Sequence, residues 1–182
     1  MHLSAEFGLT YKQIEQDGFN IDSKVDMGLI SDTEIGIIES ITKGMSGLVE
    51  ALEVLEPDLL LVLGDRYEIL SVAIVATILK IPIAHLHGGE KTEGAFDEPF
   101  RHSITKMSHL HFTSTDEYRK RVIQLGEEPS NVFNVGALAI DNIKKQKLLS
   151  KEEFENQVKT IMNLGLLSKT YHTARAKIPK RQ

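Results

Sequence analysis

Residues 59–85 read LLLVLGDRYEILSVAIVATILKIPIAH, and three segments follow one another in this stretch. The apolar run at 59–63 is unbroken and has the length of a strand that is buried on both faces. Residues 69–79 are apolar on almost every side and long enough for a buried helix, and residues 81–85 are again a short apolar run. This order predicts a βαβ unit whose two parallel strands are adjacent and central in the sheet.

The segment before this unit predicts one further strand and one helix. Residues 24–27 alternate polar and apolar side chains like a short edge strand, and Ser31 or Asp32 can then cap a helix. Apolar residues at three- and four-residue steps give that helix one face, which we expect to pack on the sheet. These residues are Ile35, Ile38, Ile41, Met45, Leu48, Val49 and Leu52.

The alternation of helices and strands continues after the βαβ unit. Helices are expected near 99–108 and 116–125, and strands at 110–113 and 132–135. A chain that alternates in this way predicts an α/β fold with a doubly wound parallel sheet.

Composition narrows the class of protein. The chain has 182 residues, 41% of them hydrophobic and 26% charged, and a formal net charge of −5, which gives no long-range attraction for nucleic acid or an anionic membrane. No apolar stretch has the length of a membrane span, and the first residues do not resemble a signal peptide. The absence of cysteine excludes thiolate metal sites and fits the cytoplasm.

Polar residues gather where the predicted strands end, and ligands of open parallel sheets bind at this edge. Asp65 follows the first apolar run, and its carboxylate either acts on a substrate or caps the next helix. Gly88 and Gly89 either let the backbone approach a ligand or form a simple turn. Asp97 and Glu98 are either an acid–base pair with a raised pKa or an ordinary surface pair.

The histidines and Arg101 leave further alternatives open. Two His-Leu-His triplets, at 85–87 and 109–111, could each point two imidazoles to one side of a strand and bind a metal. No third ligand at a known spacing accompanies them, so hydrogen bonding is the favoured interpretation and no metal is predicted. Arg101 either binds phosphate or sugar oxygens or pairs with Asp97 or Glu98.

Five motifs together resemble the hydrolysing UDP-N-acetylglucosamine 2-epimerases. Their order and spacing make a chance match a poor explanation, and the resemblance covers roughly residues 1–160. The motifs are MHLS at 1–4, GDRYE at 64–68, AHLHGGEKTEGAFDE at 84–98, RHSITK at 101–106 and VGALAID at 135–141.

The resemblance implies a fold of two facing Rossmann-like domains, the glycosyltransferase-B arrangement, with the substrate in the cleft between them. It also implies an anti elimination of UDP across C1 and C2, followed by addition of water, which yields N-acetylmannosamine and UDP. Members of the family need no cofactor, make sialic acid and related sugars, and are expected to be homo-oligomers. The implied ligand is a nucleotide sugar.

The resemblance also suggests roles for individual residues. Asp65 and Asp97 match family carboxylates that act as acid or base. A third family carboxylate often stands where this sequence has His87, so either His87 or the nearby Glu90 takes that role. The remaining residues of the motifs are expected to bind substrate: Arg66, His85, Gly88, Gly89, Glu98 and Arg101.

The chain is expected to be a partial copy of such an enzyme. We assign residues 1–160 to part of the N-terminal domain and residues 161–182 to a divergent tail, whose last fourteen residues are basic and expected to be disordered. The family holds UDP largely through a second domain that has no counterpart in this sequence. The chain alone is therefore expected to be inactive as an epimerase.

Three other functions stay open. The first is a hydrolysing epimerase for a UDP-linked 2,4-diacetamido-trideoxyhexose, which the sequence barely distinguishes. The second is an inactive fragment that only folds or binds sugar weakly. The third is a non-hydrolysing epimerase, which the His-Gly-Gly-Glu pattern at 87–90 disfavours, because those enzymes usually have His-x-Glu-Ala-Gly there.

Overall fold

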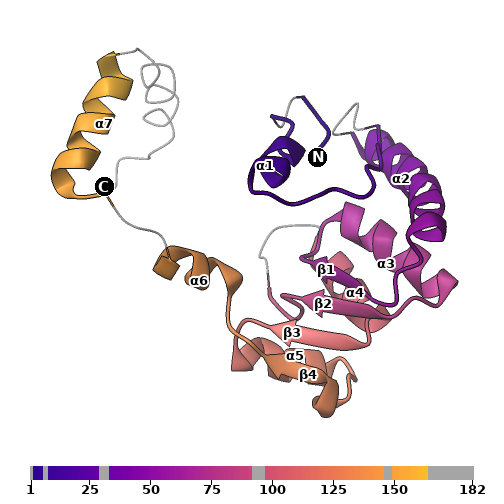
Figure 1. The fold of residues 1–182 in the computed structure, drawn as a ribbon. Coiled ribbons are helices and arrows are strands. Elements are labelled where there is room, and N and C mark those ends of the chain that lie inside the picture. The colour runs from indigo at the N-terminus through magenta and orange to yellow at the C-terminus, as the bar shows by residue number, and fades with distance from the viewer. Residues whose placement is uncertain (1, 6–7, 29–32, 92–96, 146–148, 164–182) are drawn as a thin grey trace, which may run out of the picture. The chain divides into compact units, whose positions relative to one another are not determined.

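A computed structural model of the chain shows two compact units, Met1–Leu138 and Ala139–Gln182 (Figure 1). The first unit holds the sheet, and the second contains most of α6 (Leu138–Lys145) and all of α7 (Lys151–Asn163). The basic tail predicted at 169–182 lies outside the described residues. The structure describes residues 2–5, 8–28, 33–91, 97–145 and 149–163.

The first unit is built on a parallel sheet of four strands in the order β1-β2-β3-β4. The bounds of the strands are β1 (Leu60–Leu63), β2 (Ile83–Leu86), β3 (Leu110–Thr113) and β4 (Val132–Asn134). In the register of the sheet, Val62 lies beside His85, His85 beside His111, and His111 beside Val132. The α/β fold with a parallel sheet that the sequence predicts is confirmed.

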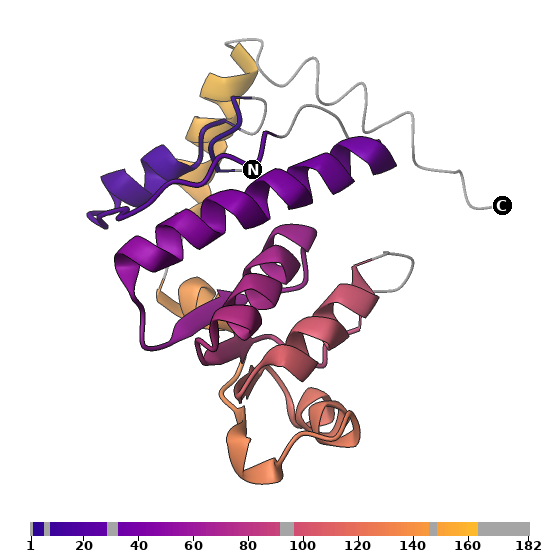
Figure 2. The same cartoon turned by 90° about the vertical axis from the view of Figure 1, so that its right-hand side faces the viewer.

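The connecting helices cover one face of this sheet. They are α3 (Tyr67–Leu79), α4 (Glu98–Met107) and α5 (Asp116–Gln124), and Figure 2 shows α2, α3 and α4 side by side. Right-handed crossovers that all step in the same direction place their helices on the same face. The core lies between this face and the helices, and its buried members are Val62, Ala73, Ala76, Ile83 and Ile104.

The opposite face of the sheet is open in part, which corrects one prediction. The run at 59–63 is not a central strand: β1 is the edge strand of the four, with Leu61 66% and Leu63 52% exposed. Its adjacency to β2 is as predicted. Further along the same face, Phe112 and Phe133 stack with ring centroids 5.6 Å apart. The unbroken apolar sequence of β1 therefore buries only one of its two faces here.

The N-terminal segment approaches the sheet without joining it. It contains α1 (Tyr11–Gln16), and residues 24–27, predicted as an edge strand, have no strand partner. Val25 and Met27 instead pack on α2 (Glu34–Leu55) at Gly47 and Gly44, where an added Cβ would lie 2.8 and 2.5 Å from them. The glycines of α2 thus let this segment lie close to the helix axis.

Helix α2 has the predicted extent, but its buried face differs from the prediction. Thr33 caps it by accepting from Gly36 N at 3.2 Å, whereas Ser31 and Asp32 lie outside the described residues. Its buried residues are Gly36, Ser40, Gly44 and Leu52, while Ile35 is 70% and Ile38 61% exposed. The helix packs on α3, and its glycines Gly44 and Gly47 face Met27 and Val25. None of the described helices is long and apolar enough to cross a bilayer.

Replacing Ile104 by alanine should test the core. Ile104 is fully buried between α4 and the sheet, so Ile104→Ala is expected to lower the free energy of unfolding by about 2–5 kcal/mol in urea titrations. The matched control is Ile78→Ala, whose side chain is 71% exposed and whose effect should stay within about 0.5 kcal/mol. Equal effects of the two substitutions would place Ile104 outside the core.

Candidate active site

Asp65 stands at the carboxyl end of β1, where the chain turns toward α3. Gly64 makes this turn with φ +89°, a conformation that favours glycine, and Arg66 is the N-cap residue of α3. The carboxylate of Asp65 is 19% exposed. Its position at the end of a parallel strand is the one predicted for a site residue.

The carboxyl end of β2 turns sharply and carries a second carboxylate. His87 has φ +64° and Gly89 has φ +75°, so the chain leaves the strand after Leu86. The amide of His87 donates to the carbonyl of Phe112 at 2.8 Å, which ties this turn to β3. A side chain with Cβ is uncommon in the left-handed region, and residues held there gather at functional sites. Glu90 follows the turn.

Arg101 joins these two strand ends. Its guanidinium is only 7% exposed, donates through Nη2 to Asp65 Oδ2, and donates through Nη1 to Glu90 Oε2 at 3.3 Å. The prediction that Arg101 could pair with Asp97 or Glu98 is therefore wrong. Two carboxylates from different strands meet one buried cation, and charge-assisted bonds of this kind fix positions well.

The other oxygen of Glu90 has two partners. Ser114, directly after β3, donates from Oγ to Glu90 Oε1 at 2.6 Å, and His87 Nδ1 lies 2.7 Å from the same oxygen. Sequence reasoning missed Ser114, although its place one residue beyond a strand end was a usable signal. The cluster of Asp65, His87, Glu90, Arg101 and Ser114 is called the carboxylate cluster below.

The bond between His87 and Glu90 fixes the roles of the imidazole nitrogens. A carboxylate only accepts hydrogen bonds, so the ring donates through Nδ1. In the neutral ring Nε2 then keeps its lone pair, and in the protonated ring it carries a proton. The arrangement can therefore take up or give a proton at Nε2 while Glu90 orients the ring.

His85 lies beneath the cluster, which corrects the expectation that it contacts substrate. It is fully buried, Nε2 donates to the carbonyl of Gly64 at 2.8 Å, and Nδ1 lies 3.2 Å from Thr105 Oγ1. Burial lowers the pKa of His85 to about 4, so the ring is neutral at pH 7. Its described contacts hold the turn before Asp65 against β2 and α4.

Gly88 and Gly89 are required by protein packing in this structure. A Cβ on Gly88 would lie 3.1 Å from Thr105 Oγ1 and 3.2 Å from His85 Nδ1. One on Gly89 would lie 2.5 Å from the carbonyl oxygen of Tyr118 in α5. The sequence suggested that a ligand could approach the backbone closely at these glycines. In the structure, α4, α5 and His85 are the close neighbours of these two residues.

Asp97 and Glu98, the predicted pair, stand at the start of α4 and have different contacts. Asp97 is the N-cap residue of α4, and its carboxylate makes no hydrogen bond or ion pair with a described residue. Glu98 lies 3.6 Å from His102 Nε2, one turn along the helix. Arg66, which is half exposed, donates to Glu68 at 3.1 Å. These three residues lie outside the carboxylate cluster.

The histidine triplets do not point pairs of imidazoles to one place. The side chain of His85 in β2 is buried, whereas His87 lies beyond the end of that strand. In the second triplet, His111 is buried and His109 is exposed. Within the part of the chain that the structure describes, no three His, Asp or Glu side chains are grouped to hold a metal ion.

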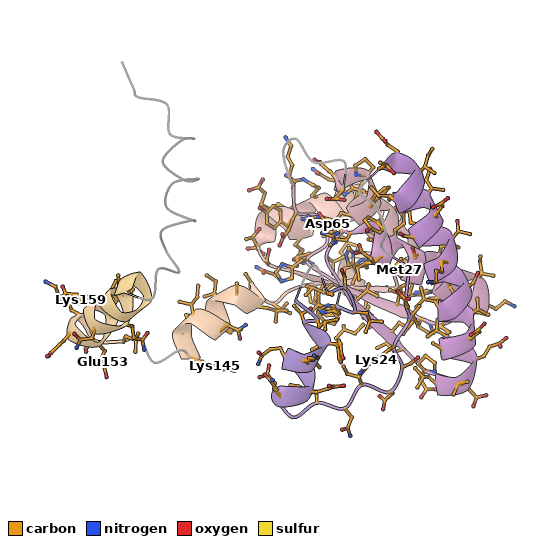
Figure 3. All side chains as sticks on the ribbon, turned by 90° about the horizontal axis from the view of Figure 1, so that it is seen from above. Lys24, Met27, Asp65, Lys145, Glu153 and Lys159 are labelled. Carbon is orange, nitrogen blue, oxygen red and sulfur yellow. The ribbon has the colours of Figure 1, made fainter. Side chains whose placement is uncertain are left out.

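A cavity of about 1040 Å³ adjoins the cluster at Asp65. Figure 3 labels Met27 and Asp65, which belong to two of its walls. The walls come from the N-terminal segment, the extended stretch before α2, and the end of β1 with the start of α3. The lining residues are His2, Leu3, Ser4, Ala5, Thr10, Val25, Asp26, Met27, Gly28, Leu63, Gly64, Asp65, Arg66, Glu68 and Ile69.

A parallel α/β sheet with acid–base side chains and a cavity at its carboxyl edge defines an α/β protein with an enzyme-like site. Comparison with known families goes one step further. The family model described as UDP-N-acetylglucosamine 2-epimerase matches residues 1–177, and the chain belongs to this family.

Two curated relatives are similar over most of the chain. The GDP/UDP-N,N'-diacetylbacillosamine 2-epimerase (hydrolyzing) of Campylobacter jejuni subsp. jejuni serotype O:2 is 48% identical over 94% of this chain. The UDP-N,N'-diacetylbacillosamine 2-epimerase (hydrolyzing) of Legionella pneumophila is 38% identical over 86% of it. The matches cover 44% and 41% of these relatives, so the chain spans less than half of their length.

A solved structure supports the fold independently. A crystal structure of the UDP-GlcNAc 2-epimerase from Neisseria meningitidis superposes with a TM-score of 0.65 at 20% sequence identity. The superposition covers 93% of this chain and 43% of the other. Likeness at this identity concerns the fold alone, and the chain corresponds to part of the N-terminal domain of a two-domain glycosyltransferase-B type fold.

The buried histidines should make stability depend on pH. Burial lowers the pKa of His85 to about 4 from 6.5 and also lowers the pKa of His111, so the unfolded chain binds protons that the folded chain refuses. The neutral state of His85 contributes fully to the free energy of unfolding well above pH 6.5. This contribution is lost as the pH drops toward 4, and it amounts to on the order of 3 kcal/mol. Urea titrations between pH 7.5 and 4.5 measure this loss.

His85→Gln removes the titrating group at this position and should flatten the decline. His2→Gln, at an exposed histidine, is the matched control and should leave the slope of the wild-type chain. Parallel slopes for wild type and His85→Gln would show that His85 does not resist protonation in the fold.

Proposed function

We propose that this chain supplies the acid–base groups of a hydrolysing UDP-sugar 2-epimerase. One observation carries the proposal: Asp65 and Glu90, from two neighbouring strand ends, are held by the same buried Arg101, with His87 bonded to Glu90. Membership in the epimerase family supports the reaction class, and the names of the two curated relatives support the hydrolysing type.

The reaction needs groups of this kind. In the elimination a base takes the proton from C2, the electron pair forms the C1–C2 double bond, and the bond from C1 to the diphosphate oxygen breaks. Water then adds its hydroxyl to C1 and a proton returns to C2 on the other face of the ring. Two proton carriers can serve both steps, one that takes the C2 proton and one that returns a proton to C2.

The carboxylate cluster offers two such carriers. Asp65 is one, and the unit of His87 and Glu90 is the other, with Nε2 as the atom that exchanges the proton. The sequence left the role open between these two residues, and the 2.7 Å hydrogen bond between them supports a shared role. Arg101 and Ser114 position the carboxylates. Asp97 stays in the proposal as a further acid, supported by the family resemblance alone.

The proposed substrate is a UDP-linked 2-acetamido sugar. The names of the two curated relatives favour UDP-N,N'-diacetylbacillosamine, a 2,4-diacetamido-6-deoxy sugar. The family description names UDP-N-acetylglucosamine, which is the alternative. The proposed products are free UDP and the sugar inverted at C2, which is N-acetylmannosamine for the alternative substrate.

Removing either carboxylate should abolish most of the turnover. The assay uses a chimera in which this chain replaces the matched 171 residues of the Campylobacter jejuni relative. Asp65→Asn and Glu90→Gln keep shape and remove charge, so UDP release should fall by roughly 10²- to 10⁴-fold, the usual contribution of acid–base groups. UDP is measured by chromatography, with a chelator present throughout, and deuterium at C2 of the product is measured after reaction in D₂O.

The matched control is Glu117→Gln, which removes an acidic group that is 77% exposed and pairs only with Arg121 among its described contacts. Its turnover should equal that of the parent chimera. Near-normal turnover of Asp65→Asn or Glu90→Gln would contradict the assignment, and loss of activity with the chelator would favour a metal site.

The chain by itself should release no UDP above the Asp65→Asn background. The buried Arg101 is already shared by Asp65 and Glu90, and the half-exposed Arg66 pairs with Glu68. Positioning of a leaving group can contribute roughly 7–11 kcal/mol to a reaction, and these residues do not supply it for the diphosphate. Release well above that background would show that this segment alone contains a complete site.

A further inference from the structure

A charged side chain of α5 bonds to the turn that carries His87 and Glu90. Arg121 donates through Nη1 to the carbonyl oxygen of Gly89, which lies 32 residues earlier in the chain. Its side chain is 27% exposed, so water shields the bond only in part. Bonds from a charged donor are stronger than bonds between neutral groups, so Arg121 holds this carbonyl firmly.

The carbonyl belongs to the peptide unit that joins Gly89 to Glu90. A peptide unit is planar and rigid, so a bond that fixes its oxygen also fixes the direction in which Glu90 continues. The carboxylate of Glu90 accepts from Ser114 at 2.6 Å and lies 2.7 Å from His87 Nδ1. The bond from Arg121 therefore bears on where this carboxylate meets the imidazole ring.

The turn needs anchors of this kind. His87 and Gly89 have φ of +64° and +75°, and such conformations persist where the surrounding structure over-determines them. On one side, the amide of His87 donates to the carbonyl of Phe112 at 2.8 Å. On the other side, α5 contacts Gly89, where an added Cβ would lie 2.5 Å from the carbonyl oxygen of Tyr118. Arg121 adds a directed bond to this second contact.

A purely structural role is the competing interpretation of Arg121. It stands in the last turn of α5, where a basic side chain complements the helix dipole. It also pairs with Glu117 at 3.3 Å, but Glu117 is 77% exposed, and exposed pairs contribute little. Neither role needs the bond to Gly89, which reaches out of the helix to the site.

Arg119 of the same helix offers a direct comparison. It donates through Nε to the carbonyl of Val132 at 2.8 Å and through Nη2 to that of Pro129 at 3.1 Å. Like Arg121, it bonds to backbone carbonyls outside α5, but these belong to β4 and to the segment before it. Residues two apart on a helix face different directions. Arg119 thus anchors β4, whereas Arg121 anchors the turn after β2.

We propose that Arg121 is a positioning residue for the proton carrier formed by His87 and Glu90. It holds the peptide between Gly89 and Glu90 so that the carboxylate accepts from His87 Nδ1, which leaves Nε2 as the atom that exchanges the proton. This inference rests on the proposed function. It adds a residue of α5 that lies outside the carboxylate cluster.

The kinetic test uses the chimera and the variant Arg121→Met, which keeps most of the side-chain length and removes the donor. The kcat for UDP release should fall roughly ten- to hundred-fold with KM changed less than about two-fold, because a misplaced acid–base group weakens transition-state stabilisation and not substrate binding. Arg121→Lys keeps a cationic donor, so its kcat should lie between those of the parent and Arg121→Met. Arg119→Met is the matched control and should keep the kcat of the parent, even where both methionine variants lower the midpoint of urea unfolding.

A second measurement uses the 182-residue chain and needs no turnover. In mildly alkaline solution the histidine rings are neutral, and ¹⁵N-labelled histidine signals distinguish the Nδ1–H form from the Nε2–H form. The signals of His87 are identified by their loss in His87→Gln. Wild type and Arg119→Met should show His87 in the Nδ1–H form, whereas the Nε2–H form should appear in Arg121→Met. Arg121→Gln, which shortens the donor, gives the same comparison in case Arg121→Met does not fold.

Three results would overturn the inference: an unchanged kcat in Arg121→Met, an unchanged form of His87 in that variant, or an equal loss of kcat in Arg119→Met. None of them affects the proposed function, which Asp65→Asn and Glu90→Gln decide. Conversely, an inactive chimera together with the Nε2–H form in Arg121→Met would refute the function and leave the positioning of His87 by Arg121 standing.

Discussion

The site depends on the ion pairs that the buried guanidinium of Arg101 makes with Asp65 and Glu90. An unpaired charge with 7% exposure would be costly, so Arg101 needs the carboxylates of Asp65 and Glu90 as much as they need a cation. Because the two carboxylates follow different strands, their shared partner also fixes the distance between the ends of β1 and β2. Helix α4, which carries Arg101, thereby becomes part of the site although its core contact is Ile104.

Turns with positive φ at the ends of β1 and β2 place Asp65 and Glu90 next to this cation. Gly64 and Gly89 take positive φ, and His87 does so despite its Cβ, which costs roughly 1–3 kcal/mol in such regions. His87 is held there by its amide bond to Phe112 O and its ring bond to Glu90. The same packing that makes Gly89 irreplaceable next to Tyr118 prevents the turn from relaxing. Strain at the turn is thus balanced by contacts to β3 and α5.

Much of this could be predicted from the sequence, and the failures have physical causes. The strand at 81–85 and the position of Asp65 followed from apolar runs and from the rule that sites lie at carboxyl ends of parallel strands, whereas Glu90 was suggested by the family resemblance. The buried face of α2 did not, because small residues at Gly36, Ser40 and Gly44 define it, and hydrophobicity patterns give them no weight. The partner of Arg101 could not be predicted either. Asp97 and Glu98 are near it in sequence, whereas Asp65 is 36 residues away and reaches it only through the sheet.

A nucleotide-sugar enzyme must move protons at the sugar and must also bind a diphosphate. The cations of this site differ in burial, which bears on both tasks. Arg101 is buried and shared by Asp65 and Glu90, whereas the half-exposed Arg66 pairs, among the described residues, with Glu68 alone. Breaking a buried pair is costly, whereas an exposed pair contributes only about 0–1 kcal/mol and does not keep another anion away. In the proposed function, the buried pairs of Arg101 therefore serve to hold the proton carriers in place.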